Sequence, residues 1–310
     1  MNVALSKILI RETPIDWDRY VLTDEDTQRF VDPAGLVGRI SDVVRGVGAF
    51  EGATLPWAGL HDKVRLPKGQ FSLWAGINFH GKSSLLRQVS LHLMRSGERV
   101  CGAFLEEQVE VTMAEFAQLM LPDVELPLQT TDVLNDWLDV ACNWASGRLW
   151  LYNQTRMMDP QRILALIAYA AKEKRCTHFV LDSLMRTGLA QDDYEGQRKF
   201  VNQLTNYAMQ LGVHIHLVHH IVKVDESQVP GRDSIRGTGA ITDQAHHVFI
   251  VWRDVTEVKP PDKPDGLLVV AKNRGIRPAN WIGKVQMHVH RSGQFLRGKF
   301  DSPMKFMERA

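Results

Sequence analysis

The sequence predicts an α/β fold in which a mostly parallel sheet carries helices on both faces and ends in a C-terminal β-hairpin. Three observations lead to this prediction. Short apolar runs typical of strands alternate with segments of helical periodicity from residue 71 onward. The first run passes through a glycine-containing loop into a helix, and later runs end in charged or polar residues such as Asp182. Strand ends of this kind form the ligand-binding edge of a parallel sheet.

The loop after the first strand fits the phosphate-binding pattern G-x-x-x-x-G-K-[ST], known as Walker A. It reads GINFHGKS and follows the apolar run 71–75. Its glycines let backbone N–H groups turn toward a phosphate chain, and the next helix points its positive end at the same anion. We expect Lys82 to contact the β- and γ-phosphates and Ser83 to ligate Mg²⁺. The predicted nucleotide-binding residues are Gly76, Asn78, His80, Gly81, Lys82, Ser83, Ser84 and Asp182.

Composition and charge set broad limits on the protein. The chain has 310 residues, of which 44% are hydrophobic, and this is enough for a globular core. A formal net charge of only +1 gives no overall basic field, so a nucleic-acid surface would have to be local or formed by assembly. The three cysteines are widely spaced without a CxxC pair, and the sequence contains neither a signal-type apolar region nor a run of 18 apolar residues. We therefore expect a cytoplasmic protein with no membrane segment.

We divide the chain into an N-terminal helical linker or docking segment (1–50), an ATPase domain (51–300) and a flexible tail (301–310). Residues 24–46 have apolar positions at helical spacing, and Pro33 is expected to break this helix. Two placements stay open for the segment: docking on a neighbouring subunit, or packing on its own domain.

The remaining elements alternate along the chain. Strands are expected at 71–75, 99–105, 149–152, 177–181, 213–218, 245–252, 267–271, 285–289 and 294–296. Helices are expected directly after the phosphate loop and at 112–120, 133–145, 161–173 and 199–211. The last two strands form the closing hairpin, and 185–198, 222–238 and 259–264 are expected to be loops.

Three strand ends offer catalytic groups beside the phosphate loop. Glu106 follows the second strand, where a carboxylate can activate an attacking water, although Glu106 and Glu107 can equally form the acidic start of the next helix. Asp182 closes an apolar strand in the Walker B arrangement and can reach Mg²⁺ through its water shell. His220 ends another strand, where it either senses the γ-phosphate or is an ordinary surface or hydrogen-bonded histidine.

Basic residues gather in two later stretches. The segment 222–238 places Lys223, Arg232 and Arg236 among glycines such as Gly237. Such a loop can move with hydrolysis and bind a polyanion, although a solvated surface loop would have the same composition. Lys272 and Arg274 follow a late strand, and we expect this fifth strand end to converge on the same site. Because the pair is distant in sequence from the phosphate loop, it can also act on another subunit's nucleotide.

The order and spacing of these motifs resemble the RecA-like motor domain of DnaB-type replicative helicases, a group that includes phage primase-helicases and mitochondrial Twinkle. The resemblance covers about residues 55–298 and rests on GINFHGKS, FLEE, FVLDS, LVHH, SIRGTGAITDQA and KNR. The LEE form and the histidine at position 220 look closer to the phage primase-helicase branch than to bacterial DnaB. The resemblance implies a RecA-like P-loop NTPase.

The same resemblance implies a role for each site residue. Lys82 and Ser83 would hold phosphate and Mg²⁺, Glu106 would activate water, Asp182 would organise the metal, and His220 would sense the γ-phosphate. Lys272 and Arg274 match the family's K-x-R finger, which acts in trans on the adjacent subunit's nucleotide. The segment 223–239, with Lys223, Arg232, Arg236 and Gly237, matches loops that line a ring's central channel and hold single-stranded DNA.

The implied function is an ATP-dependent DNA helicase or translocase of a phage or plasmid replication system, acting as a hexameric ring on single-stranded DNA. It would use ATP, or another NTP or dNTP, with Mg²⁺, in the cytoplasm of the bacterial host if the protein is phage-encoded. The residues before the ATPase domain are too few for a primase, so a separate primase, loader or polymerase is the expected further partner. Two alternatives stay open: a RecA- or KaiC-like ATPase without unwinding, and a nucleotide-dependent module that loads a separate helicase.

Overall fold

The computed structural model describes residues 28–45, 51–190, 192–221, 228–235, 239–255, 263–274 and 280–306. The chain divides into two compact units, Met1–Arg45 and Gly46–Ala310. In the described part of the first unit, the 3-10 turn η2 (Pro33–Leu36) leads into helix α2 (Val37–Val44). The helix is shorter than predicted, because Pro33 starts the helical stretch and Asp32 caps it by accepting a hydrogen bond from the Ala34 N–H at 3.0 Å. No described side chain of this unit is buried within it.

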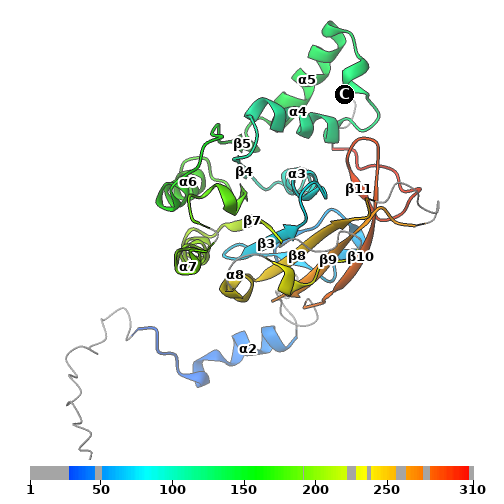
Figure 1. The fold of residues 1–310 in the computed structure, drawn as a ribbon. Coiled ribbons are helices and arrows are strands. Elements are labelled where there is room, and N and C mark those ends of the chain that lie inside the picture. Colours follow the sequence, from blue (N-terminus) through cyan, green and yellow to red (C-terminus); the bar gives the residue numbers. More distant parts are fainter. Residues whose placement is uncertain are drawn as a thin grey trace, which may run out of the picture. The chain divides into compact units, whose positions relative to one another are not determined.

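A large sheet organises the second unit (Figure 1). Within the described residues its strand order is β11-β10-β9-β8-β3-β7-β6-β4-β5. The strands β5, β4, β6, β7, β3 and β8 run parallel, whereas β9, β10 and β11 continue the sheet with antiparallel pairing. The predicted mostly parallel sheet and closing hairpin are therefore confirmed. The bounds are β3 (Phe71–Gly76), β4 (Val100–Phe104), β5 (Leu149–Leu151), β6 (His178–Asp182), β7 (His214–His220), β8 (His247–Arg253), β9 (Gly266–Asn273), β10 (Gly283–Val289) and β11 (Phe295–Leu296).

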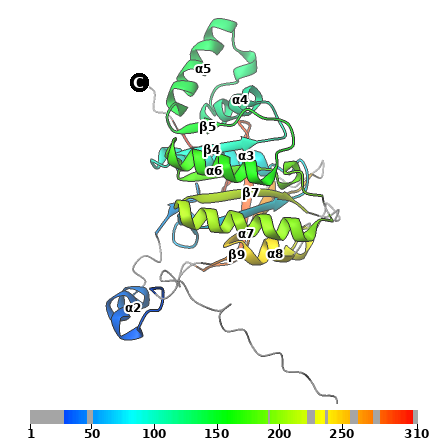
Figure 2. The ribbon, with the colours of Figure 1, turned by 90° about the vertical axis from the view of Figure 1, so that its left-hand side faces the viewer.

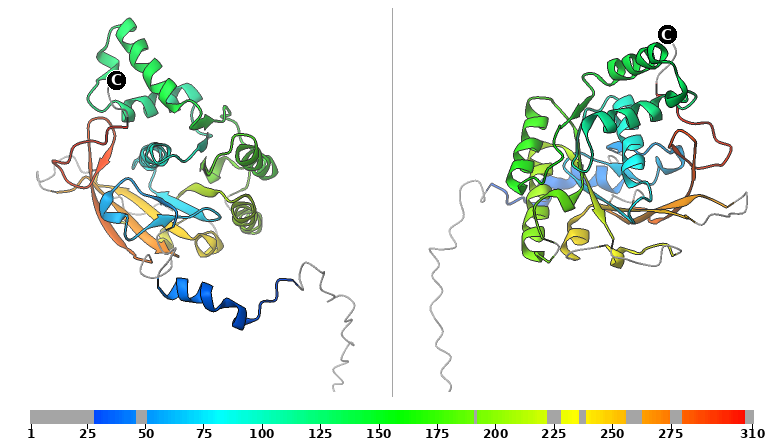
Figure 3. Two further views of the ribbon diagram at one scale, coloured as in Figure 1. Left: turned by 180° about the vertical axis from the view of Figure 1, so that it is seen from behind. Right: turned by 45° about the horizontal axis from the view of Figure 1, so that its top comes forward.

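Helices cover both faces of the sheet, as predicted. One face carries α3 (Lys82–Arg95), α4 (Val109–Met120) and α5 (Thr131–Ala145), and α4 and α5 lie together beyond α3 in both views of Figure 3. The other face carries α6 (Pro160–Lys172), α7 (Tyr194–Leu211) and α8 (Gly239–Gln244), which Figure 2 turns toward the viewer. Successive β3 side chains point to opposite faces, so Trp74 joins the core under α3 and Leu73 joins the core under α7.

Several boundaries differ from those that the sequence predicts. Helix α7 begins at Tyr194 rather than at residue 199, because Asp193 caps it by accepting the Gly196 N–H at 2.9 Å. The short helix α8 was not predicted, and β9 extends through Asn273. Two-residue strands, β1 (Ala53–Thr54) and β2 (Arg65–Leu66), pair in the segment before β3.

Four buried histidines form a line across the amino-terminal half of the parallel strands: His178, His214, His216 and His247. Neighbouring rings lie 4.7 to 5.9 Å apart between centroids. An indole nitrogen can only donate, so His216 accepts from Trp74 through Nδ1 at 3.2 Å and donates through Nε2 to His178 Nδ1 at 3.0 Å. His214 bonds Ser72 Oγ and the Pro67 oxygen, each at 2.7 Å. Burial lowers the pKa of all four rings, to about 4 for His214.

The segment after residue 300, which the sequence predicts to be flexible, packs on the domain in its described part. Phe306 is 4% exposed, and the main chain of Met304 bonds the Gln294 amide at 2.8 and 2.9 Å. Across the described ranges, no helix combines the length and apolar character that spanning a membrane requires.

Candidate nucleotide-binding site

The phosphate loop connects β3 to α3, and two of its glycines are required by geometry. Gly81 has φ of +85° at the start of α3, a conformation that a side chain would strain. A Cβ on Gly76 would collide with the main-chain oxygen of Val251 in the neighbouring strand. Phe79 also has a positive φ, of 63°, and is 97% exposed. The loop therefore has the backbone shape that the sequence pattern predicts.

Lys82 lies buried against the loop. Its ammonium donates hydrogen bonds to the main-chain oxygens of Gly76 at 3.1 Å and Ile77 at 2.8 Å. Burial lowers the pKa of Lys82 to about 8, while the charges of Asp182 and Glu106 oppose this fall. The side chain is therefore charged at neutral pH and can bind a phosphate oxygen that replaces these carbonyl contacts.

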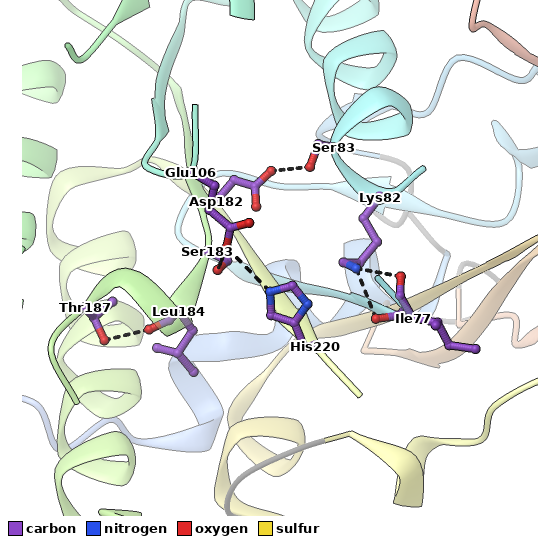
Figure 4. Close-up of polar contacts among 10 residues, drawn as sticks. Ile77, Lys82, Ser83, Glu106, Asp182, Ser183, Leu184, Thr187 and His220 are labelled. Atoms are coloured by element: carbon purple, nitrogen blue, oxygen red, sulfur yellow. Dashed lines mark hydrogen bonds and ion pairs between the residues drawn. The ribbon is translucent and has the colours of Figure 1, made fainter. Parts of the chain in front are cut away.

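Ser83 and Asp182 lie together where Mg²⁺ was predicted (Figure 4). The Ser83 hydroxyl donates to Asp182 Oδ2 at 2.6 Å. Burial raises the pKa of Asp182, whereas the Ser83 hydrogen bond and the charges of Arg87 and Lys82 act in the other direction. A buried carboxylate beside a hydroxyl is a donor set that suits Mg²⁺, which usually binds one or two protein oxygens together with phosphates and waters. The described residues contain no cluster of three or more His, Cys, Asp or Glu that could hold a metal ion.

Three adjacent strand ends, those of β4, β6 and β7, bring Glu106, Ser183 and His220 together (Figure 4). Ser183 Oγ donates to Glu106 Oε1 at 2.5 Å, and His220 Nε2 lies 3.6 Å from the same oxygen. The His220 contact, with the Ser183 hydrogen bond, lowers the pKa of Glu106 to about 2 against the opposing effect of burial. Glu106 is therefore ionised at neutral pH. Because its low pKa makes the carboxylate a weak base, Glu106 is better suited to orienting a water molecule than to removing a proton from it.

Glu106 and Glu107 separate into different roles. Glu107 forms an ion pair with the buried Arg87 of α3 and accepts a hydrogen bond from Thr112 Oγ1 of α4 at 2.7 Å. Arg87 pairs with Glu115 of α4 as well. Glu107 therefore links α3 to α4. Glu106 instead contacts residues at the ends of the neighbouring strands.

These groups line one cavity of about 820 Å³. Of the predicted residues, the cavity contains Asn78, Gly81, Lys82, Ser83, Ser84, Glu106, Asp182 and His220. Residues that the sequence reasoning missed also line it: Phe79, Arg87, Phe104, Glu107, Glu115, Met157, Met185, Arg186 and Arg253. Arg253 ends β8 beside the phosphate loop, so the strand-end rule that singled out Asp182 could have found it.

The side chain of His80 does not line this cavity. It is 2% exposed, and its Nδ1 accepts a hydrogen bond from the Arg253 main-chain N–H at 3.0 Å. The His80 side chain therefore anchors the phosphate loop to β8, and nucleotide binding by His80 stays a prediction that concerns its main chain.

Lys272 and Arg274 lie at the opposite edge of the sheet from the phosphate loop. Strand β9 is antiparallel to β8, and Asn273 pairs with His247 at the beginning of β8. In turn, His247 is level with Ser72 at the beginning of β3. The prediction that five strand ends converge is therefore wrong for this pair, because the late strand runs in the reverse direction. Of the predicted DNA-binding residues, Arg232 forms an ion pair with Asp243, and Lys223, Arg236 and Gly237 lie outside the described residues.

Comparison with known proteins shows a family and a fold. The family profile described as an AAA domain matches residues 53–226. A solved ATPase domain aligns with a TM-score of 0.71 and 15% identity over 86% of this chain and 99% of its own. A DnaB-like replicative helicase studied with its primase interactions aligns with a TM-score of 0.69 and 14% identity, over 86% of this chain and 67% of that chain. A KaiC-like protein of the hyperthermophilic archaeon Pyrococcus horikoshii aligns with a TM-score of 0.52 and 16% identity, over 74% of this chain and 89% of that chain. At these identities the likeness is one of fold, which is RecA-like and of the DnaB type.

Proposed function

Since the chain belongs to the AAA domain family, we propose that it is an ATP-dependent DNA helicase or translocase of a phage- or plasmid-type replication system, acting as a hexameric ring on single-stranded DNA. The observation that carries the proposal is the hydrogen bond from Ser83 to Asp182 beside the ammonium of Lys82, with Glu106 on the next strand end. This is an arrangement for binding and hydrolysing a Mg²⁺-bound nucleoside triphosphate.

Each residue of the site has a distinct task in this reaction. Lys82 and the N–H groups of the phosphate loop bind the triphosphate, and Ser83 and Asp182 would hold Mg²⁺. When bound, Mg²⁺ neutralises charge on the transferred phosphoryl group. Glu106 orients the attacking water, because Ser183 and His220 fix the direction of its carboxylate. His220 also reports loss of the γ-phosphate, since it can exchange contact with Glu106 for contact with phosphate.

A second subunit completes the proposed site. Lys272 and Arg274, here called the finger pair, lie at the edge of the sheet remote from their own phosphate loop. This placement supports action in trans, where a cation on the transferred phosphoryl group adds about 10³ to 10⁵ in rate in related NTPases. Lys223, Arg232, Arg236 and Gly237 are the proposed contacts to single-stranded DNA, and a separate primase, loader or polymerase is the proposed further partner.

Strand displacement on forked DNA tests the proposal. Purified protein with ATP and Mg²⁺ should release the displaced strand, and single-stranded DNA should stimulate hydrolysis. Lys82→Ala should abolish both activities while leaving the protein folded. The helicase proposal is wrong if the wild type neither unwinds the fork nor responds to DNA. The mass of the assembled particle with nucleotide and a short strand tests the ring, since a hexamer has six times the 35.2 kDa of one chain.

A mixing experiment tests the finger pair separately. Arg274→Ala protein and Lys82→Ala protein should each be inactive alone, but mixed rings contain interfaces with an intact phosphate loop and an intact finger. Mixing should therefore restore part of the hydrolysis. If Arg274 acts on its own subunit's nucleotide, mixing restores none.

The KaiC-like match supports one alternative, a ring- or filament-forming ATPase without unwinding activity. Electron microscopy of the nucleotide-bound protein separates filaments from closed rings, and the forked substrate separates an ATPase from a helicase. A helicase loader, the other alternative, would hydrolyse ATP slowly, without stimulation by DNA, and would bind a separate helicase.

A further inference from the structure

Both side chains of the finger pair are bonded to the last turn of α8. Lys272 Nζ donates to the main-chain oxygens of Thr242 and Asp243, each at 2.7 Å. Arg274 Nη2 donates to the same oxygen of Asp243 at 2.8 Å. Cations commonly satisfy the unpaired carbonyls at the end of a helix. Both finger cations therefore share one acceptor, the main-chain oxygen of Asp243, and Lys272 has a second acceptor in the oxygen of Thr242.

The carboxylate of Asp243 makes a separate contact. Its Oδ1 lies 3.6 Å from Arg232 Nη2, on the 3-10 turn η6 (Arg232–Ser234). Both side chains are partly exposed, 70% for Asp243 and 44% for Arg232, so an external polyanion can reach the guanidinium. The main chain of Asp243 therefore contacts the finger pair, and its side chain contacts Arg232, a predicted DNA-binding residue.

We propose that Asp243 is a positioning residue that couples nucleic-acid binding to the placement of Lys272 and Arg274. The inference rests on the proposed function, which puts Arg232 on single-stranded DNA and the finger pair on a neighbouring nucleotide. A phosphodiester bound to Arg232 competes with the Asp243 carboxylate. Loss of that ion pair lets the end of α8 change position, and the two finger side chains that are bonded to it move with it.

Helix capping alone does not explain this arrangement. A cap needs only the main-chain oxygen of residue 243, which is present whatever side chain stands at that position. The coupling needs the carboxylate as well. Replacing the carboxylate by an amide therefore distinguishes helix capping from the coupling, because Asp243→Asn keeps the capping oxygen and removes the negative charge that holds Arg232.

The decisive measurement is stimulation of ATP hydrolysis by single-stranded DNA in the assembled protein. A partly exposed ion pair is weak, so Asp243→Asn should reduce the stimulation ratio by about threefold to fivefold through kcat, with little change in KM. Affinity for a labelled oligonucleotide should stay within about twofold of wild type. Asp139→Asn, which removes an exposed carboxylate on α5, is the matched control and should behave as wild type.

A double-mutant cycle tests whether the two side chains act through each other. If they do, Arg232→Gln combined with Asp243→Asn loses no more stimulation than the worse single variant. Losses that multiply would overturn the coupling, and so would a normal stimulation ratio in Asp243→Asn.

Hydrolysis without DNA gives a second readout, which separates this inference from the helicase proposal. Burial, then Arg274 and Arg232, lower the pKa of Lys272 to about 8, and Asp243 opposes them. Among the described residues, His246 and His247 also interact electrostatically with Lys272. Lys272 and Lys82 both have a pKa lowered to about 8, so activity that needs both charges should fall above about pH 8. Asp243→Asn should move the part of this fall that Lys272 causes to lower pH. Lys272→Arg, which stays charged, should remove that part and leave the part that Lys82 causes.

Different outcomes of these two measurements refute different proposals. A wild type without any response to DNA refutes the helicase proposal and the coupling together, and the pH profile still decides whether Asp243 positions the finger pair. A wild type that responds to DNA, with an Asp243→Asn variant whose stimulation ratio and pH profile are both unchanged, refutes only the inference about Asp243.

Discussion

Acidification to pH 5 should remove much of the protein's stability, because four histidines are buried as neutral rings in the middle of the sheet. Their hydrogen bonds require neutral tautomers: His216 accepts from the Trp74 indole, and His178 accepts from His216. Protonating Nδ1 of either ring would turn that acceptor into a second donor. Burial also opposes the charged form, which is why the pKa of each ring is lowered.

The magnitude follows from proton linkage. A base whose pKa is lower in the folded state contributes stability that is fully present above its unfolded pKa and is lost as pH falls from there toward the folded value. For His214, with a pKa of 6.5 unfolded and about 4 folded, the loss at pH 5 is about 2 kcal/mol. Burial lowers the pKa of the other three rings as well, and for each of them the unfolded chain limits the loss to about 2 kcal/mol. The four rings together therefore cost at most about 8 kcal/mol, which is comparable with the 5–15 kcal/mol of a typical domain.

Carboxylates change this result only slightly between pH 7.5 and 5. The pKa of Glu106 is about 2 folded and 4.5 unfolded, so its stabilisation is lost only below this range. The pKa of Asp182 is raised, so its protonation acts in the opposite direction and offsets part of the loss. The net prediction is a steep fall in stability that starts near pH 6.5.

Urea unfolding at pH 7.5, 6.5, 5.5 and 5.0 measures this fall. The matched variant is His178→Asn, whose side-chain oxygen can still accept from His216 but does not titrate in this range. Its free energy of unfolding should change with pH by about 2 kcal/mol less than that of the wild type. The reasoning fails if the wild-type free energy stays constant within about 1 kcal/mol over this range, or if His178→Asn retains the full pH dependence.

Three further predictions follow from particular contacts. Glu106→Gln should lower kcat for ATP hydrolysis by about a hundredfold or more while a fluorescent ATP analogue still binds; an unchanged kcat would exclude Glu106 from catalysis. Arg87→Met should lower the free energy of unfolding by about 3 kcal/mol, because it leaves two carboxylates without their buried cation, and a loss below about 1 kcal/mol in urea titration would contradict this. Maleimide at pH 7.5 should label Cys142 alone in the folded protein, since the other two thiols are buried with raised pKa values; mass spectrometry showing more than one label per chain would disprove it.

The alternation of elements and the phosphate loop were predictable from sequence because both depend on residues that are close together in the chain. The loop needs Gly76, Gly81 and Lys82 at set spacings, and each strand or helix shows its own period. The start of α7 was missed although its signal is local: Asp193 is an ordinary capping residue, but Gly196 in the first turn was interpreted as part of a loop.

The site was only partly predictable. The end of an apolar strand located Glu106, Asp182 and His220, and these residues do lie around one cavity. The sequence pattern could not distinguish the role of Glu106 from that of Glu107, because both residues follow the same strand. Their roles separate only through Arg87 and Thr112, which arrive from two helices.

What the sequence by itself determined is the nucleotide cradle and the parallel strands around it, since spacing and periodicity within a few residues encode them. What only the tertiary structure decided is which groups meet: the reversed β9 carries Lys272 and Arg274 to the far edge, and His80 turns inward to β8. Strand direction and hydrogen-bond partners depend on pairing between residues that are distant in the chain. No local pattern records that pairing, because its free energy comes from contacts that exist only after the sheet has assembled.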